Sequence, residues 1–386
     1  MSNRYSRLSG WGHYVPSQVL TNDDISLIVD TNDEWVRERT GIRERRIAES
    51  HETSLTMAKA ASERALSVAG IDASDLDLIL VATSTPDYLL PPVSSQLQHE
   101  LGTKKTAAFE VRAGCTGFVY SLATAHQFIS AGTYRRVLVV GVELISRAVD
   151  WQDRRTCVLF GDGAGAVVLE ASERPTGVLD FVLGSDGSGA EALMMPGGGS
   201  KQPFDAQVLA ERGQFIRMNG NAVLRFAMRK LGPALLEAVE KSGLRIADVD
   251  LIIPHQANLR ILELIARQND IPWEKMYVNI ERYGNTSAAS IPIALSEAVE
   301  EGRLQEGNHV AMVTYGAGFT WAALALRWGV GPATAEEVFG KQPLQLPQRM
   351  LRTARSSVKR RRTQLMTNLS PLLLPLYAMS KRVRRG

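Results

Sequence analysis

Two stretches of the chain, 173 residues apart, carry the same pattern of a helix followed by an apolar strand. Residues 54–84 form the first stretch and residues 233–256 the second. At this offset six pairs are identical: Ala65 and Ala238, Gly70 and Gly243, Asp75 and Asp248, Asp77 and Asp250, Leu78 and Leu251, Ile79 and Ile252. The run VLVV (137–140) also falls on VAMV (310–313). A period this long indicates a duplicated domain and not a solenoid, whose repeats span about 20–50 residues.

The duplicated unit is of the α/β class. The runs VLVVGVEL (137–144) and AVVLEA (166–171) are apolar almost throughout, which is typical of strands covered by helices on both faces. We therefore predict layers of helices and sheets in which two halves face each other across a pseudo-two-fold axis. We assign residues 1–175 to the first half, 176–330 to the second and 331–386 to a C-terminal extension.

Charge separates the extension from the two halves. The chain has a net charge of +3, and residues 331–386 hold twelve Lys or Arg against two Glu, so this extension carries +10 and residues 1–330 carry −7. An acidic body gives no charge argument for binding nucleic acid. For the extension we favour a solvated, partly disordered segment. The alternatives are contact with a membrane surface and recruitment of an acidic carrier protein.

Composition favours a globular protein of the cytoplasm. Hydrophobic residues make up 45% of the chain, and no run of about 18 apolar residues indicates a spanning helix. The first residues lack the apolar core of a secretory signal, and two cysteines cannot form a disulfide framework. The six histidines are scattered, so we expect no metal site.

The sequence VRAGCTGF places Cys115 in the turn between a predicted strand (107–111) and a predicted helix (118–132). A helix N-terminus favours a thiolate, so this position is expected to lower the pKa of Cys115 from about 8.5 and make it a nucleophile. The flanking glycines allow a tight turn. The alternative is a buried structural cysteine, which is how we interpret Cys157 in its strand-like segment.

Two further motifs, PHQAN (254–258) and YGNTSAAS (283–290), offer polar groups at the ends of apolar segments. His255 follows the duplicated strand, where open α/β sheets place their sites, and a neutral imidazole can stabilise an enolate by donating a hydrogen bond. Asn285 offers a second donor that does not ionise. The alternatives are a core histidine and a capping asparagine. At an offset of 170, RAGCT falls on RYGNT, so Cys115 aligns with Asn285 and the two loops are expected to meet.

Three glycine-rich stretches remain. GDGAGAVVL (161–169) runs into a strand and has no P-loop lysine, so we exclude nucleotide binding and expect tight backbone packing. GGGS (197–200) indicates a loop. YGAGFTW (315–321) ends a strand, and we expect the N–H of Gly318 to join that of Cys115 in an oxyanion hole.

In this order, GCTGF, PHQAN and YGNTSAAS resemble the β-ketoacyl-acyl carrier protein synthase III family of the thiolase superfamily. The resemblance covers roughly residues 5–330 and includes TNDEWVRERTGIRERRIA, FGDGAGAVVL, SDGSGAEALMMPGGGS, IRMNG and GAGFTW. It implies the five-layered α-β-α-β-α thiolase fold, a homodimer and no cofactor. The implied activity is condensation of an acyl-coenzyme A primer with malonyl-acyl carrier protein, which initiates fatty-acid biosynthesis.

The resemblance also assigns roles to single residues. Cys115 would take the acyl group from coenzyme A, while His255 and Asn285 would hold the malonyl thioester carbonyl as CO2 leaves. The positions that match coenzyme A contacts are Trp35, Arg39 and Arg154. The positions that match the carrier-protein docking segment are Gln256, Ala257, Asn258, Leu259 and Arg260.

Two positions depart from the family pattern. Leu90 falls where the family closes the acyl pocket of the neighbouring subunit, often with phenylalanine, so a smaller leucine indicates a longer or branched primer. Arg112 stands beside the predicted nucleophile, where small or neutral residues are common. The alternative function is a specialised paralogue that condenses or transfers longer or branched acyl groups in secondary metabolism. A non-catalytic partner is disfavoured because all three polar groups are retained.

Overall fold

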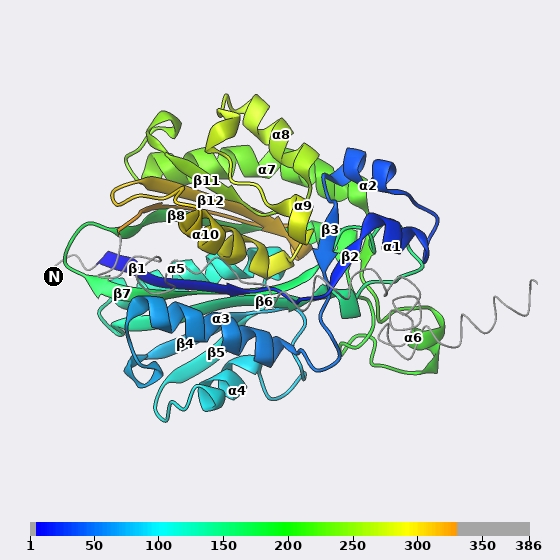
Figure 1. Ribbon diagram of the computed structural model, residues 1–386, viewed down its shortest axis with the longest axis horizontal. Coiled ribbons are helices and arrows are strands. Elements are labelled where there is room, and N and C mark those ends of the chain that lie inside the picture. The colour runs from blue at the N-terminus through cyan, green and yellow to red at the C-terminus, as the bar shows by residue number, and fades with distance from the viewer. Residues whose placement is uncertain (1–4, 330–386) are drawn as a thin grey trace, which may run out of the picture.

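The computed structural model describes residues 5–329 and arranges them in five layers (Figure 1). Two β-sheets enclose a pair of helices, and further helices cover the outer face of each sheet. The predicted α-β-α-β-α fold is confirmed. No helix within residues 5–329 is long and apolar enough to cross a membrane. The predictions for residues 331–386 concern a segment outside the described residues.

The first half of the chain supplies a five-stranded sheet. Its strands follow the order β1 (Tyr5–Tyr14), β7 (Asp162–Ser172), β6 (Arg136–Leu144), β4 (Leu78–Ala82) and β5 (Ala107–Val111). Strand β4 is parallel to β5 and β6, and β7 is antiparallel to β1 and β6. Strands β4 and β6 are buried because α3 (Ser54–Ala69) and α4 (Val93–Glu100) cover one face and α5 (Gly117–Ser130) covers the other.

The second half supplies a four-stranded sheet. Its strands follow the order β11 (Leu251–Pro254), β12 (His309–Gly316), β13 (Thr320–Arg327) and β8 (Gly177–Ser185). Its outer face carries α7 (Gly220–Lys241), which packs against α8 (Leu259–Gln268), and its inner face meets α10 (Ser290–Glu300). Helix α7 begins well before Pro233, where the helix was predicted, because Phe226 and Leu231 extend its buried face.

Shorter elements connect the layers. The short helices are α1 (Asn22–Ser26), α2 (Asp33–Thr40), α6 (Ala206–Ala210) and α9 (Ile280–Tyr283). Two small antiparallel pairs join β2 (Val19–Thr21) to β3 (Glu44–Arg46) and β9 (Leu193–Met194) to β10 (Arg217–Met218). The 3-10 turns are η1 (Ala73–Asp75), η2 (Gly114–Thr116), η3 (Ile145–Arg147), η4 (Gly187–Ala192), η5 (Ile246–Asp248), η6 (Trp273–Lys275), η7 (Ser287–Ala289) and η8 (Ala317–Phe319).

The two sheets repeat the same strand pairing, which identifies equivalent residues in the two halves. Leu78 of β4 pairs with Val137 of β6, and Leu251 of β11 pairs with Val310 of β12. Each residue of the second pair is numbered 173 higher than its counterpart in the first pair, which is the offset found in the sequence. The second sheet has no full strand in the position of β5 within the described residues. A single parallel β-bridge between Ile252 and Met276 takes its place. The duplication is therefore present in the register of the strands.

The alignment of Cys115 with Asn285 is wrong by three residues. Turn η2 (Gly114–Thr116) leads into α5 and turn η7 (Ser287–Ala289) leads into α10, and the two turns are related by the offset of 173. The first residue of each turn has a positive φ, 55° in η2 and 49° in η7. Cys115 therefore corresponds to Ala288. The offset of 170 matched the letters of two motifs, whereas strand register and helix starts agree on 173.

Two packing predictions have different outcomes. A Cβ on Gly165 of β7 would lie 2.7 Å from Pro292 of α10, so the glycines of GDGAGAVVL do allow close packing of a helix on the sheet. Cys157 is fully buried, as predicted, but it lies in a turn and not in a strand. Its backbone N–H donates to the Asp153 carbonyl at 3.0 Å, which closes a helical turn that the apolar pattern did not reveal.

Replacing Gly165 with alanine is expected to lower the free energy of unfolding by about 1–3 kcal/mol, because the new methyl group overlaps Pro292. Denaturant unfolding measures this change. Gly199→Ala is the matched control, since a Cβ there meets nothing within 4 Å and we expect a change below about 0.5 kcal/mol. Equal stability of the two variants would contradict the packing argument.

Candidate active site

Cys115 lies in η2, where the first half of the chain touches the second. Ser287 Oγ is 3.4 Å from Cys115 Sγ, and Thr314 Oγ1 donates to the Cys115 carbonyl at 3.0 Å. Gly316 packs so closely that a Cβ on it would lie 2.8 Å from the Cys115 backbone nitrogen. The nucleophile predicted from the sequence is thus held by both η7 and the end of β12.

The predicted acidity of the Cys115 thiol is wrong. The side chain is partly exposed, but burial raises the pKa of Cys115 to about 11, against the hydrogen bond from Ser287 and reinforced by the charge of Glu143. Loss of water around the sulfur outweighs the dipole of α5, whose effect is worth about 0.3–1 kcal/mol. At neutral pH the group is a thiol, so a nucleophilic role requires a proton acceptor.

His255 follows β11 directly and is 1% exposed. Its backbone N–H donates to the Val313 carbonyl at 2.8 Å, and its Nδ1 lies 2.7 Å from Ser290 Oγ. That oxygen also accepts the backbone N–H of Gln256 at 3.4 Å, so its own proton is free to point at Nδ1. We therefore assign the imidazole proton to Nε2. Burial lowers the pKa of His255 to about 3, and the ring is neutral.

Asn285 is 6% exposed and is fixed through its backbone. It forms a β-bridge with Phe160, and its N–H donates to the Leu159 carbonyl at 2.8 Å. Its Oδ1 accepts the N–H of Ser287 at 2.8 Å. Within residues 5–329 its Nδ2 makes no hydrogen bond, so this amide is an available donor. Ser287 contacts both Asn285 and Cys115, which brings these two loops together.

Two aromatic and backbone features complete this neighbourhood. The ring of Tyr315 meets the ring of His255 edge-on, with 5.6 Å between the ring centroids. Burial, reinforced by charge on Cys115, raises the pKa of Tyr315. Gly318 lies in η8 with φ of 74°, and η8 touches η2, since a Cβ on Gly114 would lie 3.2 Å from the nitrogen of Ala317. An oxyanion hole at Gly318 stays a prediction that this contact supports.

A platform of one indole and two guanidinium groups lies on the elements around α2. Arg39 lies over the Trp35 ring at 4.8 Å and Arg154 over the same ring at 5.4 Å. Arg154 also donates to the Asp30 carbonyl at 2.9 Å. Both arginines are exposed, and Arg154 also pairs with the Asp30 carboxylate at 3.4 Å, so the platform joins an aromatic ring to two exposed guanidinium groups. This combination suits a ligand with an aromatic base and phosphates.

The predicted docking segment divides into a buried and an exposed part. Gln256 is 1% exposed, its amide donates to the carbonyls of Pro254 and Tyr277, and its Oε1 accepts the N–H of Asn279. Gln256 therefore fixes the loop after β11, and its assignment to carrier-protein docking is wrong. Arg260 is exposed in the first turn of α8 and makes no side-chain hydrogen bond within the described chain.

The intervening residues tie this segment to α2. Asn258 caps α8 through Oδ1 and donates from Nδ2 to the Arg39 carbonyl at 3.0 Å. Leu259 packs against Gly41. Ala257, two residues earlier in the chain, is partly buried. Arg260 and the platform around Trp35 therefore lie on connected elements.

Two residues that depart from the family pattern are exposed. Leu90 is 84% exposed in the loop before α4, next to the exposed Tyr88 and Leu89. Arg112 follows β5, and its side chain has no hydrogen bond or ion pair within residues 5–329. The structure shows no contact between Arg112 and the Cys115 sulfur.

Sequence reasoning missed three side chains of the site: Glu143, Ser287 and Ser290. The first had a signal, because an acid inside the apolar run VLVVGVEL must be buried with hydrogen-bond partners. The two serines had none, since they belong to a run of small residues that reads as a helix start. Within the described chain no cluster of His, Cys, Asp or Glu could hold a metal ion.

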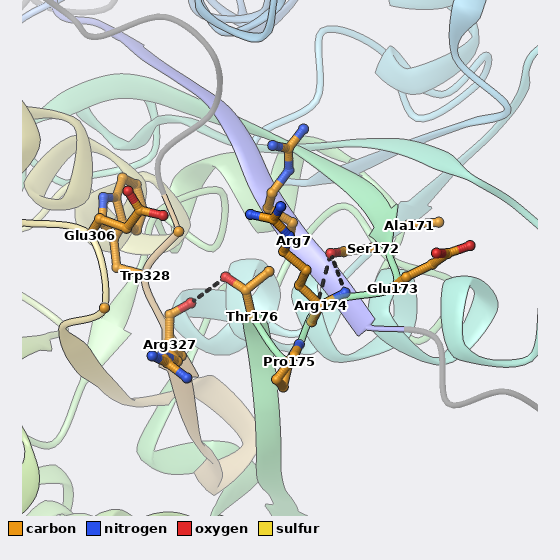
Figure 2. Close-up of a pocket in the computed structure, with 12 residues that line it drawn as sticks. Arg7, Ala171, Ser172, Glu173, Arg174, Pro175, Thr176, Glu306, Arg327 and Trp328 are labelled. Carbon is orange, nitrogen blue, oxygen red and sulfur yellow. Dashed lines mark hydrogen bonds between the residues drawn. The ribbon is translucent and has the colours of Figure 1, made fainter.

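A separate pocket lies at the edge of the molecule where the described chain ends. Figure 2 shows its lining, which includes Arg7, Arg174 and Arg327 together with Glu173 and Glu306. None of the predicted site residues lines it. Its mixture of charges indicates no ligand of one sign, and the turns η2 and η7 remain the candidate site.

Comparison with known proteins identifies the family of the chain. The family model described as 3-oxoacyl-[acyl-carrier-protein] synthase III matches residues 109–187, and the model of its C-terminal part matches residues 239–328. The β-ketoacyl-[acyl-carrier-protein] synthase III of Symbiobacterium thermophilum is 48% identical over 322 residues, which cover 83% of this chain and 98% of that protein. The chain belongs to the β-ketoacyl-[acyl-carrier-protein] synthase III family.

Further proteins are similar over the same extent. Synthase III 1 of Bacillus anthracis is 48% identical over 320 residues, 83% of this chain and 98% of that protein. The crystal structure of the Aquifex aeolicus synthase III has a TM-score of 0.78 at 44% identity, covering 84% of this chain and all of that one. The priming β-ketosynthase of the R1128 polyketide pathway has a TM-score of 0.80 at 37% identity, covering 86% and 98%.

The His255 ring is expected to stay neutral through the range in which an ordinary histidine titrates, near pH 6.5. Because its folded-state pKa is lowered to about 3, the native state binds fewer protons than the unfolded state between these values, and His255 lowers stability as pH falls through them. Imidazole NMR signals measured from pH 5 to 8, with free histidine as reference, check this. A His255 signal that moves with the reference would contradict the assignment.

Proposed function

We propose that the protein condenses an acyl-coenzyme A primer with malonyl-acyl carrier protein to give 3-oxoacyl-acyl carrier protein, CO2 and coenzyme A, the step that initiates fatty-acid biosynthesis. The observation that carries this proposal is the contact of Ser287 with both Cys115 and Asn285, at the start of the helix whose Ser290 holds a neutral His255, in a chain of this family. The similarity to β-ketoacyl-[acyl-carrier-protein] synthases III favours this function over the alternative of a secondary-metabolism paralogue.

In the first half-reaction, Cys115 Sγ attacks the thioester carbon of the primer and coenzyme A leaves. The covalent acyl-enzyme divides one difficult condensation into two easier steps. The N–H groups of Cys115 and Gly318 stabilise the oxyanion. This role is supported by the position of Gly318, which has a positive φ in η8, the turn that touches η2.

In the second half-reaction, His255 Nε2 and Asn285 Nδ2 donate hydrogen bonds to the malonyl thioester carbonyl. Negative charge grows on this oxygen as CO2 leaves, and the resulting carbanion attacks the acyl group on Cys115. Two neutral donors suit this task because neither repels the developing charge. One such donor is worth about 10²–10³ in rate.

The surrounding surface supports binding of both substrates. The Trp35 ring with Arg39 and Arg154 is proposed to hold the coenzyme A nucleotide. The exposed Arg260 is proposed to face the acidic carrier protein, and Asn258 links the two regions. No cofactor enters this scheme.

A homodimer is part of this proposal. Strand β5 is an edge strand that exposes 38% of Phe109, and the loop at Leu90 exposes three large apolar side chains in a row. Exposed strand edges and apolar patches mark association surfaces. Leu90 would then close the acyl pocket of the partner and, being smaller than phenylalanine, admit a longer or branched primer. A cytoplasmic location also stays a prediction.

The deciding assay follows CO2 and 3-oxoacyl product from malonyl-acyl carrier protein with a panel of acyl-coenzyme A primers. Cys115→Ala is expected to abolish condensation, because no acyl-enzyme forms. Cys157→Ala is the control, since that thiol is fully buried and is not hydrogen-bonded to Cys115, His255 or Asn285 within the described chain, so its removal should leave the chemistry intact. Absence of CO2 with every primer, or full activity of Cys115→Ala, would refute the proposal.

Ser290→Ala is expected to slow malonyl decarboxylation about 10–100-fold, because it removes the hydroxyl that holds the proton of His255 on Nε2. Acylation of Cys115, followed as coenzyme A release, should stay unchanged. Ser296→Ala is a matched control: it lies on the same helix and its hydroxyl also contacts a histidine, His13, at 2.9 Å. Equal effects of the two variants would mean a structural role for Ser290.

A further inference from the structure

Strand β6 carries a buried acid that the proposed reaction leaves without a task. Glu143 is fully buried, and within residues 5–329 no Lys, Arg or His forms an ion pair with it. Burying a carboxylate without a cation costs several kcal/mol. Its neighbours in β6 are apolar, so no demand of the sheet places an acid at this position.

Hydrogen bonds aim one oxygen of Glu143 at the site. Oε2 accepts the Ser84 N–H at 3.1 Å and the Thr85 hydroxyl at 2.6 Å. Thr85 Oγ1 in turn accepts the N–H of Leu144 at 2.9 Å, which fixes its direction. Oε1 accepts the Ser287 hydroxyl at 3.0 Å.

Ser287 stands between this carboxylate and the Cys115 sulfur. Its Oγ lies 3.0 Å from Glu143 Oε1 and 3.4 Å from Cys115 Sγ, and its single proton can serve only one of them at a time. Its φ of 49° costs a non-glycine residue about 1–3 kcal/mol, and the equivalent position in the first half is a glycine. A serine is thus present at a position where glycine fits better.

We propose that Ser287 and Glu143 form the proton path of the nucleophile, in which Glu143 is the general base for acylation of Cys115 and Ser287 relays the proton. The proposal rests on the function proposed above.

The proton movements balance within this path. As Sγ bonds to the acyl carbon, the S–H proton passes to Ser287 Oγ and the Ser287 proton passes to Glu143 Oε1. When the tetrahedral intermediate collapses, the bond to coenzyme A sulfur breaks and the same path returns one proton to that sulfur. The net change is exchange of the acyl group between two thiols, with Glu143 again a carboxylate.

The electrostatics of the site agree with this assignment. Burial raises the pKa of Glu143 to about 7 despite the donors around it, close to the value that serves a general base best at neutral pH. His255 cannot take this part, because its pKa is lowered to about 3 and its Nδ1 is held by Ser290. Within the described chain no titratable side chain is hydrogen-bonded directly to Cys115 Sγ, and Glu143 is the acid that reaches it through Ser287.

Single-turnover acylation of Cys115 by acyl-coenzyme A, followed by protein mass across pH 5–9, tests the path. The groups that face Glu143 are Ser84, Thr85 and Ser287, which do not titrate, and Cys115 beyond Ser287. Glu143→Gln is expected to slow acylation about 10²-fold and to remove the inflection near pH 7. In a Cys115→Ala background it should leave malonyl decarboxylation unchanged.

A second variant and a control keep the outcome clear. Ser287→Gly removes the hydroxyl while keeping the positive φ, and it should slow acylation as much as Glu143→Gln, with no further loss in the double variant. Asp162→Asn removes another fully buried carboxylate, bonded to Ser146 and not to Cys115, and should keep the inflection. Thermal melting verifies that each variant is folded.

Two results would overturn the path: acylation by Glu143→Gln at the unaltered rate, or equal losses in acylation and decarboxylation, which would indicate a structural role. Failure of the proposed function is a different observation. In that case the unaltered protein would release no CO2 with any primer, or Cys115→Ala would keep full condensing activity, whatever the behaviour of the Glu143 variant.

Discussion

The contact between turns η2 and η7 is the constraint on which the site depends. Each turn begins with a residue of positive φ, and each leads into one of the two inner helices. This geometry places Ser287 against Cys115 and fixes Asn285, two residues earlier, through its Oδ1, so that its Nδ2 is an available donor. The two sheets and their outer helices hold α5 and α10 in the positions that make this contact.

The duplicated halves have divided the chemistry between them at equivalent positions. In the first half a Cβ on Gly117 would lie 3.0 Å from Ala82, so two small residues meet where helix α5 passes the end of β4. The offset of 173 carries this pair onto Ser290 and His255, which are hydrogen-bonded at 2.7 Å. One half therefore contributes the thiol and its buried acid, and the other contributes the neutral donors.

Much of this arrangement could be predicted from the sequence, because the relevant signals are periodic or local. The layered fold follows from strands such as β6 that are apolar throughout, and the place of Cys115 follows from a strand and a helix on either side of it. The exact pairing of the halves could not be predicted, because matching letters in RAGCT and RYGNT favoured an offset three residues away from the one that the strand register shows.

Other features depend on contacts between distant parts of the chain. The pKa of Cys115 is set by the protein that surrounds the sulfur, which a helix start in the sequence does not reveal. Gln256 looks like a surface residue of a polar loop, yet three backbone groups occupy its amide. The link from Glu143 through Ser287 joins β6 to a turn that follows it by more than a hundred residues in the chain.

The left-handed backbone at Ser287 and the unpaired carboxylate of Glu143 are both features that weaken a fold. Stabilising substitutions are therefore expected at these two residues. They are glycine in place of Ser287 and an apolar residue of similar volume in place of Glu143. The positions with the most stability to gain are thus those with the most chemistry to lose. Heat resistance selected without an activity screen would lead toward an inert protein.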